Sequence, residues 1–318
     1  MVAGVTSGHW SSMLAKRLLG AIPTLFVIIT LSFLMMRLTP GGPFDSQRVV
    51  SPEVQANLAR AYHLDEPLYR QYVRYIGGIL RGDFGPSFTN RDFTVTQLIR
   101  QGFPVSLQLG LAAMLLALMA GLSLGTLAAL RRDRPSDHAV NAFAMVGIII
   151  PNFVMAPFLI LLFGVWLGWL PAGGWGDGHQ FAYKVLPIIS LALPRIAAIA
   201  RLSRASMIEA LQLPFIRTAV AKGLPQHVVL LRHAARAAIL PVVSYLGPAM
   251  ANIVTGSVVV EQIFSIPGIG RYFVVAAIER DYTLVTGVVI FYGAIIILFN
   301  LVVDMLYGLL DPRVGGRR

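Results

Sequence analysis

Long apolar stretches separated by short polar segments dominate the pattern of this chain. Stretches long enough to cross the roughly 30 Å of hydrocarbon in a bilayer lie at residues 18–37, 104–129, 139–168, 185–201, 238–260 and 284–309. Pro187, Pro194 and Arg195 interrupt the fourth stretch. Membrane helices tolerate proline where neighbouring helices satisfy the freed carbonyls, so we expect a kinked helix there. The pattern predicts an all-α membrane protein with six transmembrane helices.

The positions of lysine and arginine predict the direction of these helices. Lys and Arg near span ends mark the cytoplasmic side. They gather at the N-terminus, in the "RRDRPSD" loop, in the loop at 202–237 and in the tail. Residues 38–103 hold seven arginines, but long loops cross largely regardless of charge. We therefore expect both termini in the cytoplasm, and the first apolar stretch to be a retained signal anchor.

These assignments give an expected organisation of the whole chain. It consists of a cytoplasmic N-terminus with helix 1 (1–37), an extracytoplasmic segment (38–103), a core of helices 2–6 (104–309) that includes the cytoplasmic loop 202–237, and a cytoplasmic tail (310–318).

The extracytoplasmic segment is predicted to be partly helical. "SPEVQANLARAYHL" begins with Ser51 as a helix N-cap, and "PLYRQYVRYIGGIL" begins with Pro67, which suits a first helical position. Two Gly-rich stretches, 171–181 and 265–273, are expected to form outer turns.

Composition agrees with a membrane location. The chain has 318 residues, of which 56% are hydrophobic and 13% charged, and its mean hydropathy is +0.70; soluble domains carry about 25% charged residues. The net charge is +11, and most of the cationic residues flank the apolar stretches. These residues therefore indicate the topology of the chain and contacts with lipid headgroups rather than nucleic-acid binding. Because cysteine is absent, disulfides and thiolate metal sites are excluded.

The sequence offers no support for catalysis, a metal or a cofactor. A P-loop ends in Gly-Lys-Ser/Thr, and none of the three lysines, Lys16, Lys184 and Lys222, precedes Ser or Thr. ATP hydrolysis by that route is therefore excluded for this chain. His227 and His233 are six residues apart rather than the four that put two ligands on one helical face.

Polar residues inside the apolar stretches are candidates for a translocation path or for hydrogen bonds between helices. They are Asn141, Asn152, Asn252, Asn300, Arg195 and Asp304. Arg195 and Asp304 could also form a proton relay, although a single pair is more typical of structural contacts. Gly121 and Gly125 lie one turn apart and would permit close helix packing.

The sequence "FIRTAVAKGLPQHVVLLRHAARAAILP" (215–241) concentrates cations without any acid between Glu209 and Glu261. Pro214 suits the first position of a helix and Gly223 suits its end, so a helix of about two and a half turns is predicted. Such a helix is too short to be stable alone. It needs a partner surface.

One side of this short helix combines an aromatic residue with small residues, since Phe215, Ala219, Lys222 and Gly223 are spaced at i, i+4, i+7 and i+8. Together with Arg217, this side would suit docking onto an acidic protein surface. A solvated loop lying against anionic headgroups is the alternative.

The same segment resembles the cytoplasmic signature loop of permease subunits of ATP-binding-cassette importers. Ala219, Gly223 and Leu240-Pro241 occupy the places of that signature. "RTA.AKGL", "LLRHA" and "LPVVSYLGP" resemble the dipeptide and oligopeptide branch, most nearly its B-type permeases from Gram-negative bacteria. Further similarities are "SFLMMRLTPGGPFD", "YHLDEPLYRQY", "RGDFGPSF", "VVVEQIFSIPGIG" and "NLVVDMLYGLLDPRV". The chain departs from the branch at Val220, where Arg is usual.

The resemblance implies a type I importer permease fold in the inner membrane of a bacterium. It implies transport of peptides with a second permease, two ATP-binding subunits docked on the cytoplasmic loop and an extracytoplasmic peptide-binding protein. The residues implied in coupling are Pro214, Phe215, Arg217, Ala219, Lys222 and Gly223. A proton-coupled peptide carrier without an ATPase, and an importer of nickel or glutathione from the same branch, remain alternatives.

Overall fold

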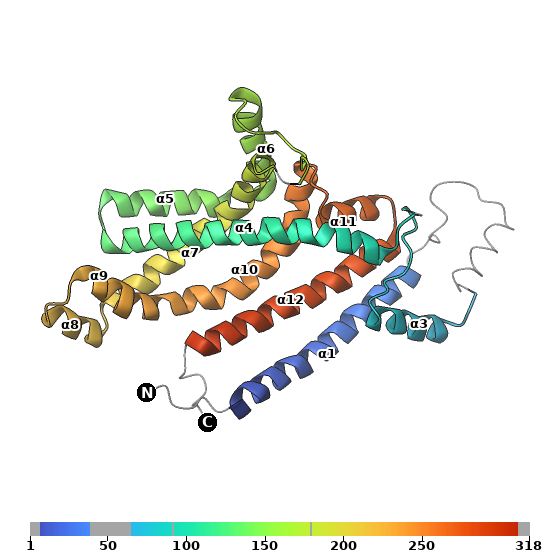
Figure 1. Ribbon diagram of the computed structural model, residues 1–318, viewed down its shortest axis with the longest axis horizontal. Coiled ribbons are helices and arrows are strands. Elements are labelled where there is room, and N and C mark those ends of the chain that lie inside the picture. Colours follow the sequence, from blue (N-terminus) through green and yellow to red (C-terminus); the bar gives the residue numbers. More distant parts are fainter. Residues whose placement is uncertain (1–6, 39–64, 91, 179, 311–318) are drawn as a thin grey trace. The chain divides into compact units, whose positions relative to one another are not determined.

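The computed structural model describes residues 7–38, 65–90, 92–178 and 180–310, and helices make up nearly all of its regular structure (Figure 1). The predicted helix at Ser51 lies outside these residues. The helices are α1 (Ser7–Leu38), α3 (Leu68–Leu80), α4 (Val95–Leu130), α5 (Pro135–Ile149), α6 (Asn152–Leu159), the π-helix η1 (Ile160–Trp166), α7 (Ala182–Leu211), α8 (Pro214–Ala221), α9 (Gln226–Val228), the π-helix η2 (Val229–Ala234), α10 (Ala235–Ile263), α11 (Ile269–Ile278) and α12 (Tyr282–Leu310).

In the described ranges, five helices are long and apolar enough to cross a membrane. They are Leu19–Leu38 of α1, α4, α7, the continuous helix Gln226–Ile263 that contains α10, and Tyr282–Leu306 of α12. The all-α membrane class predicted from the sequence is confirmed. The fourth predicted span is a 30-residue helix that contains both Pro187 and Pro194.

The third predicted span, 139–168, differs from the prediction because the structure divides it into two arms. Its arms, Pro135–Ile149 and Asn152–Trp166, meet at an angle of 105°. Pro151 lacks an N–H for the helix and disfavours helical geometry in the residue before it. Ile150 accordingly has φ −80° and ψ 116°. Pro151 then caps the second arm in an extended conformation.

Contacts of α4 show that the bent pair is a broken span rather than a loop that returns to the same side. Lys184 Nζ, near the start of α7, donates a hydrogen bond of 3.3 Å to Gln108 Oε1 in α4. Further along both helices, a Cβ on Gly121 would lie 2.8 Å from Ile199. The two helices therefore run in the same direction, and the chain between them must cross back.

The first arm of the bent pair runs opposite to α7. The start of α5 is joined to the C-terminal part of α7 through Asp137 and Arg204, whereas a Cβ on Gly147 would lie 3.0 Å from Cβ of Ala197, one to two turns earlier in α7. If the five long helices and the bent pair each cross once, the described part of the chain crosses six times.

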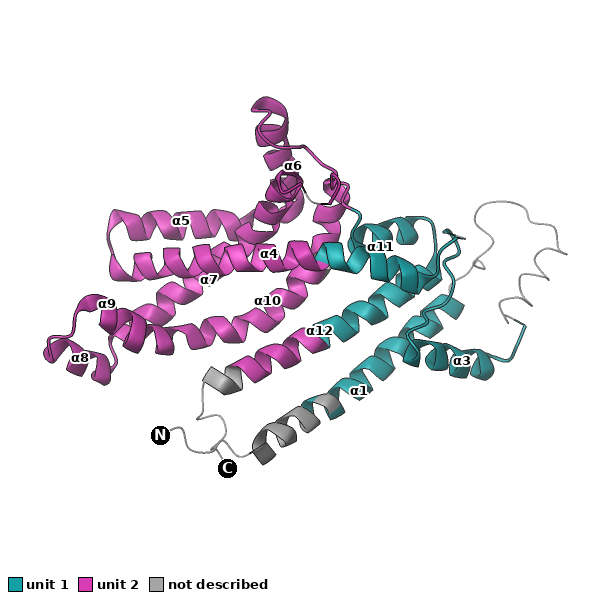
Figure 2. Ribbon diagram, in the orientation of Figure 1, with its two compact units in different colours: residues 1–106, 267–297 teal, residues 107–266, 298–318 magenta. Residues whose placement is uncertain are grey.

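The chain divides into two compact units, residues 1–106 with 267–297 and residues 107–266 with 298–318 (Figure 2). In the first unit, α1 packs against α12, and a Cβ on Gly293 would lie 2.9 Å from Ile28 Cδ1. In the second unit, α10 packs against the end of α12, where a Cβ on Gly247 would lie 2.9 Å from Asn300 Oδ1. Glycine thus permits a close helix crossing in each unit.

The predicted Gly-rich turns are only partly turns. Residues 171–178 and 180–181 are irregular. The stretch 265–273, however, becomes helical at Ile269, where α11 begins. The buried N–H of Ile269 donates a hydrogen bond of 3.0 Å to Ser106 Oγ, so a contact distant in sequence satisfies the start of this helix.

Candidate coupling site

The short helix predicted after Pro214 exists, and its first turn is set by proline. α8 spans Pro214–Ala221, with Pro214 in the first turn and Leu213 before it in an extended conformation (φ −64°, ψ 143°). Proline suits this place because its ring fixes φ near the helical value and it lacks a donor that the first turn would leave unpaired. The helix therefore begins sharply after α7.

The end of α8 is a Schellman motif, in which two backbone bonds close the last turn. Gly223 N donates to the carbonyl of Val220 at 2.9 Å, and Leu224 N donates to the carbonyl of Ala219 at 3.3 Å. Gly223 has φ +74°, and a Cβ at this position would meet nothing within 4 Å. Glycine is thus required by backbone conformation and not by crowding within this chain.

One side of α8 is buried against the neighbouring helix ends. Ile216 and Ala219 are 2% and 5% exposed. They belong to an apolar cluster with residues from the ends of α4, α7, η2 and α10, namely Ala129, Met207, Ala210, Val229, Ala234 and Ala238. Burying an isoleucine side chain stabilises a contact by about 2 kcal/mol. α8 is therefore attached to the helix ends rather than extended freely from them.

The exposed side of α8 carries apolar and cationic groups together. Phe215 is 48% and Val220 59% exposed, and Leu224, Arg217 and Lys222 are also exposed. Exposed aromatic and aliphatic groups beside cations are typical of a surface that docks another protein.

The residues predicted to form one docking side of α8 are therefore not all on its exposed side. Phe215, Lys222 and Gly223 are exposed, but Ala219 is buried. Val220 and Leu224 also belong to the exposed side, which was not predicted from the sequence. The burial of Ala219 could have been predicted from its spacing with Ile216, because residues three apart share one face of a helix.

An ion pair with a buried carboxylate braces α7 about two turns before that helix ends. Arg204 Nε and Nη2 donate to the two carboxylate oxygens of Asp137 at 2.6 and 2.7 Å. The same carboxylate accepts hydrogen bonds from the backbone N–H of Asp133 at 3.0 Å and from Asn141 Nδ2 at 2.9 Å. Asp137 is 1% exposed. This arrangement fixes the start of α5 to the C-terminal part of α7.

Three of the predicted polar residues make identifiable contacts with helices. Asn141 bonds to Asp137 one turn earlier in α5, and Asn252 donates to the carbonyl of Pro248 in its own helix at 3.0 Å. Asn300 lies against Gly247 of α10.

The other three predicted polar residues differ in their surroundings. Within the part of the chain that the structure describes, Asn152 Oδ1 and Arg195 Nε are buried and have no hydrogen-bond partner. Asp304 is partly buried. Among the described residues, no group of three His, Cys, Asp or Glu side chains could hold a metal ion.

Comparison with known proteins shows extensive similarity to transport proteins. A family model described as "Binding-protein-dependent transport system inner membrane component" matches residues 121–316. The corresponding N-terminal model matches residues 11–110. The first of these matches includes α8, α7 and the bent pair.

Individual relatives are similar over almost their whole length. The "Oligopeptide transport system permease protein OppB" of Haemophilus influenzae is 51% identical over 299 residues, which cover 94% of this chain and 97% of that protein. The protein of the same name from Escherichia coli K12 is 50% identical with the same coverage. The "Dipeptide transport system permease protein DppB" of Bacillus subtilis is 45% identical, covering 94% of this chain and 96% of that protein.

Proposed function

The chain belongs to the family of binding-protein-dependent transport system inner membrane components, and from this membership we propose that it forms half of the translocation path of an ATP-driven peptide importer. The observation that carries the cargo assignment is the 51% identity to an oligopeptide permease over 94% of this chain. α8 would be the surface through which ATP-driven movement of a partner subunit is transmitted to this chain.

The partners follow from the same membership. We propose a second, similar permease, two ATP-binding subunits and an extracytoplasmic peptide-binding protein. The ATP-binding subunits would hydrolyse ATP, since this chain lacks a Gly-Lys-Ser/Thr sequence. Both termini and α8 would lie in the cytoplasm, and the loop at 170–181 would lie outside.

Coupling would run through the exposed side of α8. Phe215, Val220 and Leu224 would enter an apolar depression of an ATP-binding subunit, and Arg217 and Lys222 would pair with acids at its rim. Because Ile216 and Ala219 are buried against the ends of α4, α7 and α10, movement of the docked subunit would displace those helix ends. Packed interfaces respond in discrete steps rather than by continuous deformation.

Two of the polar residues inside the bundle are our candidates for the translocation path. Asn152 and Arg195 each have a buried polar atom without a partner, and an unpaired buried polar group is costly unless a ligand or another subunit satisfies it. Asn141 and Asn252 bond within their own helices. Their contacts favour a structural role.

The function is tested by uptake into vesicles that contain the complete complex and ATP. We expect a labelled oligopeptide to accumulate only with the binding protein and ATP, with no effect of an uncoupler. Uptake that continues without the ATP-binding subunits and stops with an uncoupler would establish the proton-coupled carrier instead. Accumulation of nickel or glutathione in place of peptide would overturn the proposal that the cargo is a peptide.

Variants at Gly223 test the docking role within the same complex. Gly223→Asn retains the left-handed conformation that asparagine tolerates, whereas Gly223→Leu places a bulky side chain where this chain leaves open space. We expect both to insert in the membrane, and the leucine variant to lose at least tenfold in association with the ATP-binding subunits. Equal association of the leucine variant and the unchanged chain would remove α8 from the proposed role.

A further inference from the structure

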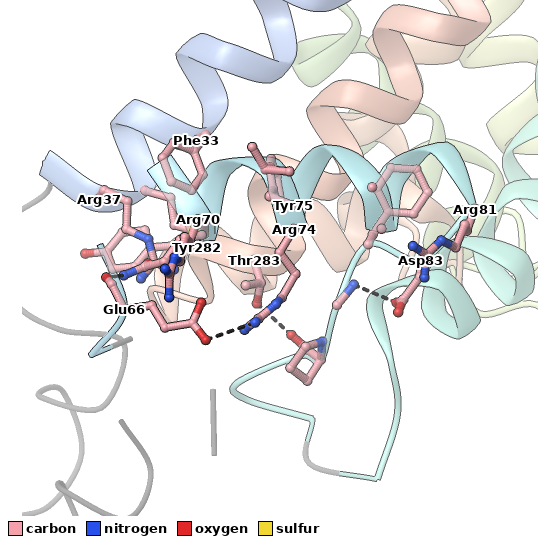
Figure 3. A pocket seen from close by; sticks show the side chains of 18 of the residues that line it. Phe33, Arg37, Glu66, Arg70, Arg74, Tyr75, Arg81, Asp83, Tyr282 and Thr283 are labelled. Carbon is pink, nitrogen blue, oxygen red and sulfur yellow. Dashed lines mark hydrogen bonds and ion pairs between the residues drawn. The ribbon is translucent and has the colours of Figure 1, made fainter. Parts of the chain in front are cut away.

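A cavity of about 850 Å³ lies within the first unit, at the end of α1 (Figure 3). Its walls come from the end of α1, from α3, from the loop after α3 and from the start of α12. The wall contains more cationic than anionic side chains, and these are Arg37, Arg70, Arg74 and Arg81 against Glu66 and Asp83. Aromatic rings complete it, namely Phe33, Tyr69, Tyr75, Phe84, Phe88 and Tyr282.

Contacts with α1 fix α3 at the depth of the membrane. Tyr72 Oη of α3 lies 2.6 Å from Thr30 Oγ1 of α1, and the Phe33 ring packs on those of Tyr72 and Tyr75 at 5.1 and 5.6 Å between centroids. Within the described residues, the apolar span of α1 covers Leu19–Leu38 and so reaches at least as far as Leu38. At about 1.5 Å per residue, Thr30 lies roughly 12 Å inside the position of Leu38. Where this span of α1 crosses the bilayer, α3 would therefore lie beside the hydrocarbon rather than above it.

The free side of α3 is apolar. Leu68, Tyr69, Val73 and Leu80 are 60%, 64%, 67% and 81% exposed, and all four lie on one half of the helix. On the opposite half, Gln71 is buried and its side chain donates to the carbonyl of Glu66 at 2.6 Å. A helix with apolar and aromatic groups on one side and arginines beside them is typical of a helix lying in the membrane interface.

The arginines of the cavity are only partly neutralised. Arg74 pairs with Glu66 at 2.9 Å, whereas Arg70 lies over the ring of Tyr69 at 5.8 Å. Arg37 lies over the Phe33 ring at 5.7 Å, and its buried Nε has no hydrogen-bond partner among the described residues. Guanidinium groups recognise phosphate through paired N–H donors. The cavity thus has donors for an anion at the depth of a lipid headgroup.

We propose that this cavity binds the phosphate headgroup of an anionic phospholipid, whose acyl chains lie along the exposed apolar sides of α1 and α3. The assignment of this lipid to the outer leaflet rests on the orientation given under the proposed function. The proposal that lipid binds does not depend on that orientation. Arg37 and Arg70 would donate to the phosphate. Leu68 and Leu80, which are exposed and do not line the cavity, would lie among the acyl chains, and Tyr69 and Val73 would lie beside the headgroup at the cavity wall.

Lipid retention by the purified full chain tests the proposal. Phosphatidylglycerol bound after detergent exchange is counted by native mass spectrometry, with phosphatidylcholine as the uncharged comparison. We expect Arg37→Gln with Arg70→Gln to reduce phosphatidylglycerol retention at least tenfold. The exposed Arg100, which does not line the cavity, provides the matched control as Arg100→Gln, for which we expect unchanged retention.

Three results of that experiment would overturn the proposal. Equal retention by the double variant and the unchanged chain would remove the arginines from lipid binding. Equal retention of phosphatidylcholine would remove the charge selectivity. Displacement of the lipid by millimolar inorganic phosphate would make the cavity a site for a soluble anion instead.

The position of α3 has an independent test, because the chain lacks cysteine and a single introduced thiol can be labelled without background. Spin labels at Leu80→Cys and at Asp92→Cys, in the exposed loop after α3, are compared in vesicles. We expect the Leu80 label to be reached by oxygen and shielded from a water-soluble nickel chelate, and the Asp92 label to show the reverse. If the Leu80 label were as accessible to the chelate as the Asp92 label, α3 would lie in water. Cross-linking of Leu80→Cys to a second permease would show that protein, rather than lipid, covers the exposed side of α3.

Discussion

Asp137 shows how one buried carboxylate can organise a helix junction near the membrane surface. It accepts two bonds from Arg204, one from the backbone of Asp133 and one from Asn141. A buried charge is costly unless it is paired and hydrogen-bonded. Here the pairing is complete, so removing either partner leaves an uncompensated charge.

Replacing Asp137 with Ala should therefore destabilise the protein by about 3 kcal/mol, the lower end expected for a broken buried pair, because the Arg204 side chain is 24% exposed. Thermal unfolding in detergent measures the change. Asp133→Asn is the control, since the Asp133 side chain is 79% exposed and asparagine tolerates the φ of +60° found there. An unchanged melting temperature for Asp137→Ala would show that the ion pair does not brace α7.

The sequence located the residues at both ends of α8 because proline and glycine act through local backbone geometry. It did not reveal that Ala219 is buried, because that depends on where the ends of α4 and α10 lie. Asp137 and Arg204 were likewise not recognised as a pair. They are 67 residues apart, and no local pattern links them.

At the scale of the element, α8 is a short helix whose two sides have different roles, attachment to the bundle and docking of a partner. Its buried side holds it to the bundle through Ile216 and Ala219, and its exposed side presents Phe215 and Val220. Attachment and docking are therefore separable by mutation, because different residues carry them.

Ile216→Ala should loosen α8 by removing most of a buried side chain, with a loss of about 2 kcal/mol or more. We expect amide hydrogen exchange in residues 214–223 to accelerate at least tenfold. Phe215→Ala, on the exposed side, should leave exchange unchanged and weaken association with the ATP-binding subunits. The same exchange rates in both variants would show that α8 is not held by Ile216.

The other elements were predictable to the extent that apolar length determines them. Length alone located the long helices. It did not locate the bend after Ile150, because proline is compatible both with a continuous helix, as in α7, and with a break, as at Pro151. α11 was missed because its start depends on Ser106, from a distant part of the chain.

At the scale of the whole molecule, the topology depends on whether the bent pair crosses the membrane. The parallel course of α4 and α7 requires that it does. The loop before α5 and the loop before α7 should then lie on opposite sides.

Single cysteines at Arg132 and Asp177, both exposed loop positions, test this expectation in the cysteine-free chain. A membrane-impermeant maleimide added to intact cells should label Asp177→Cys, and it should label Arg132→Cys only after permeabilisation. A return of the bent pair to its starting side would instead give the two positions the same accessibility.

The break after Ile150 also bears on how the chain is assembled during synthesis. Each arm of the bent pair has 15 residues, or roughly 22 Å of helix at 1.5 Å per residue, whereas the hydrocarbon is about 30 Å thick. Neither arm can cross alone, and the carbonyls freed at the break need cover from neighbouring helices. α5 packs on α7, which the ribosome makes later. We therefore expect the packing of the third span to be completed only after the fourth has emerged.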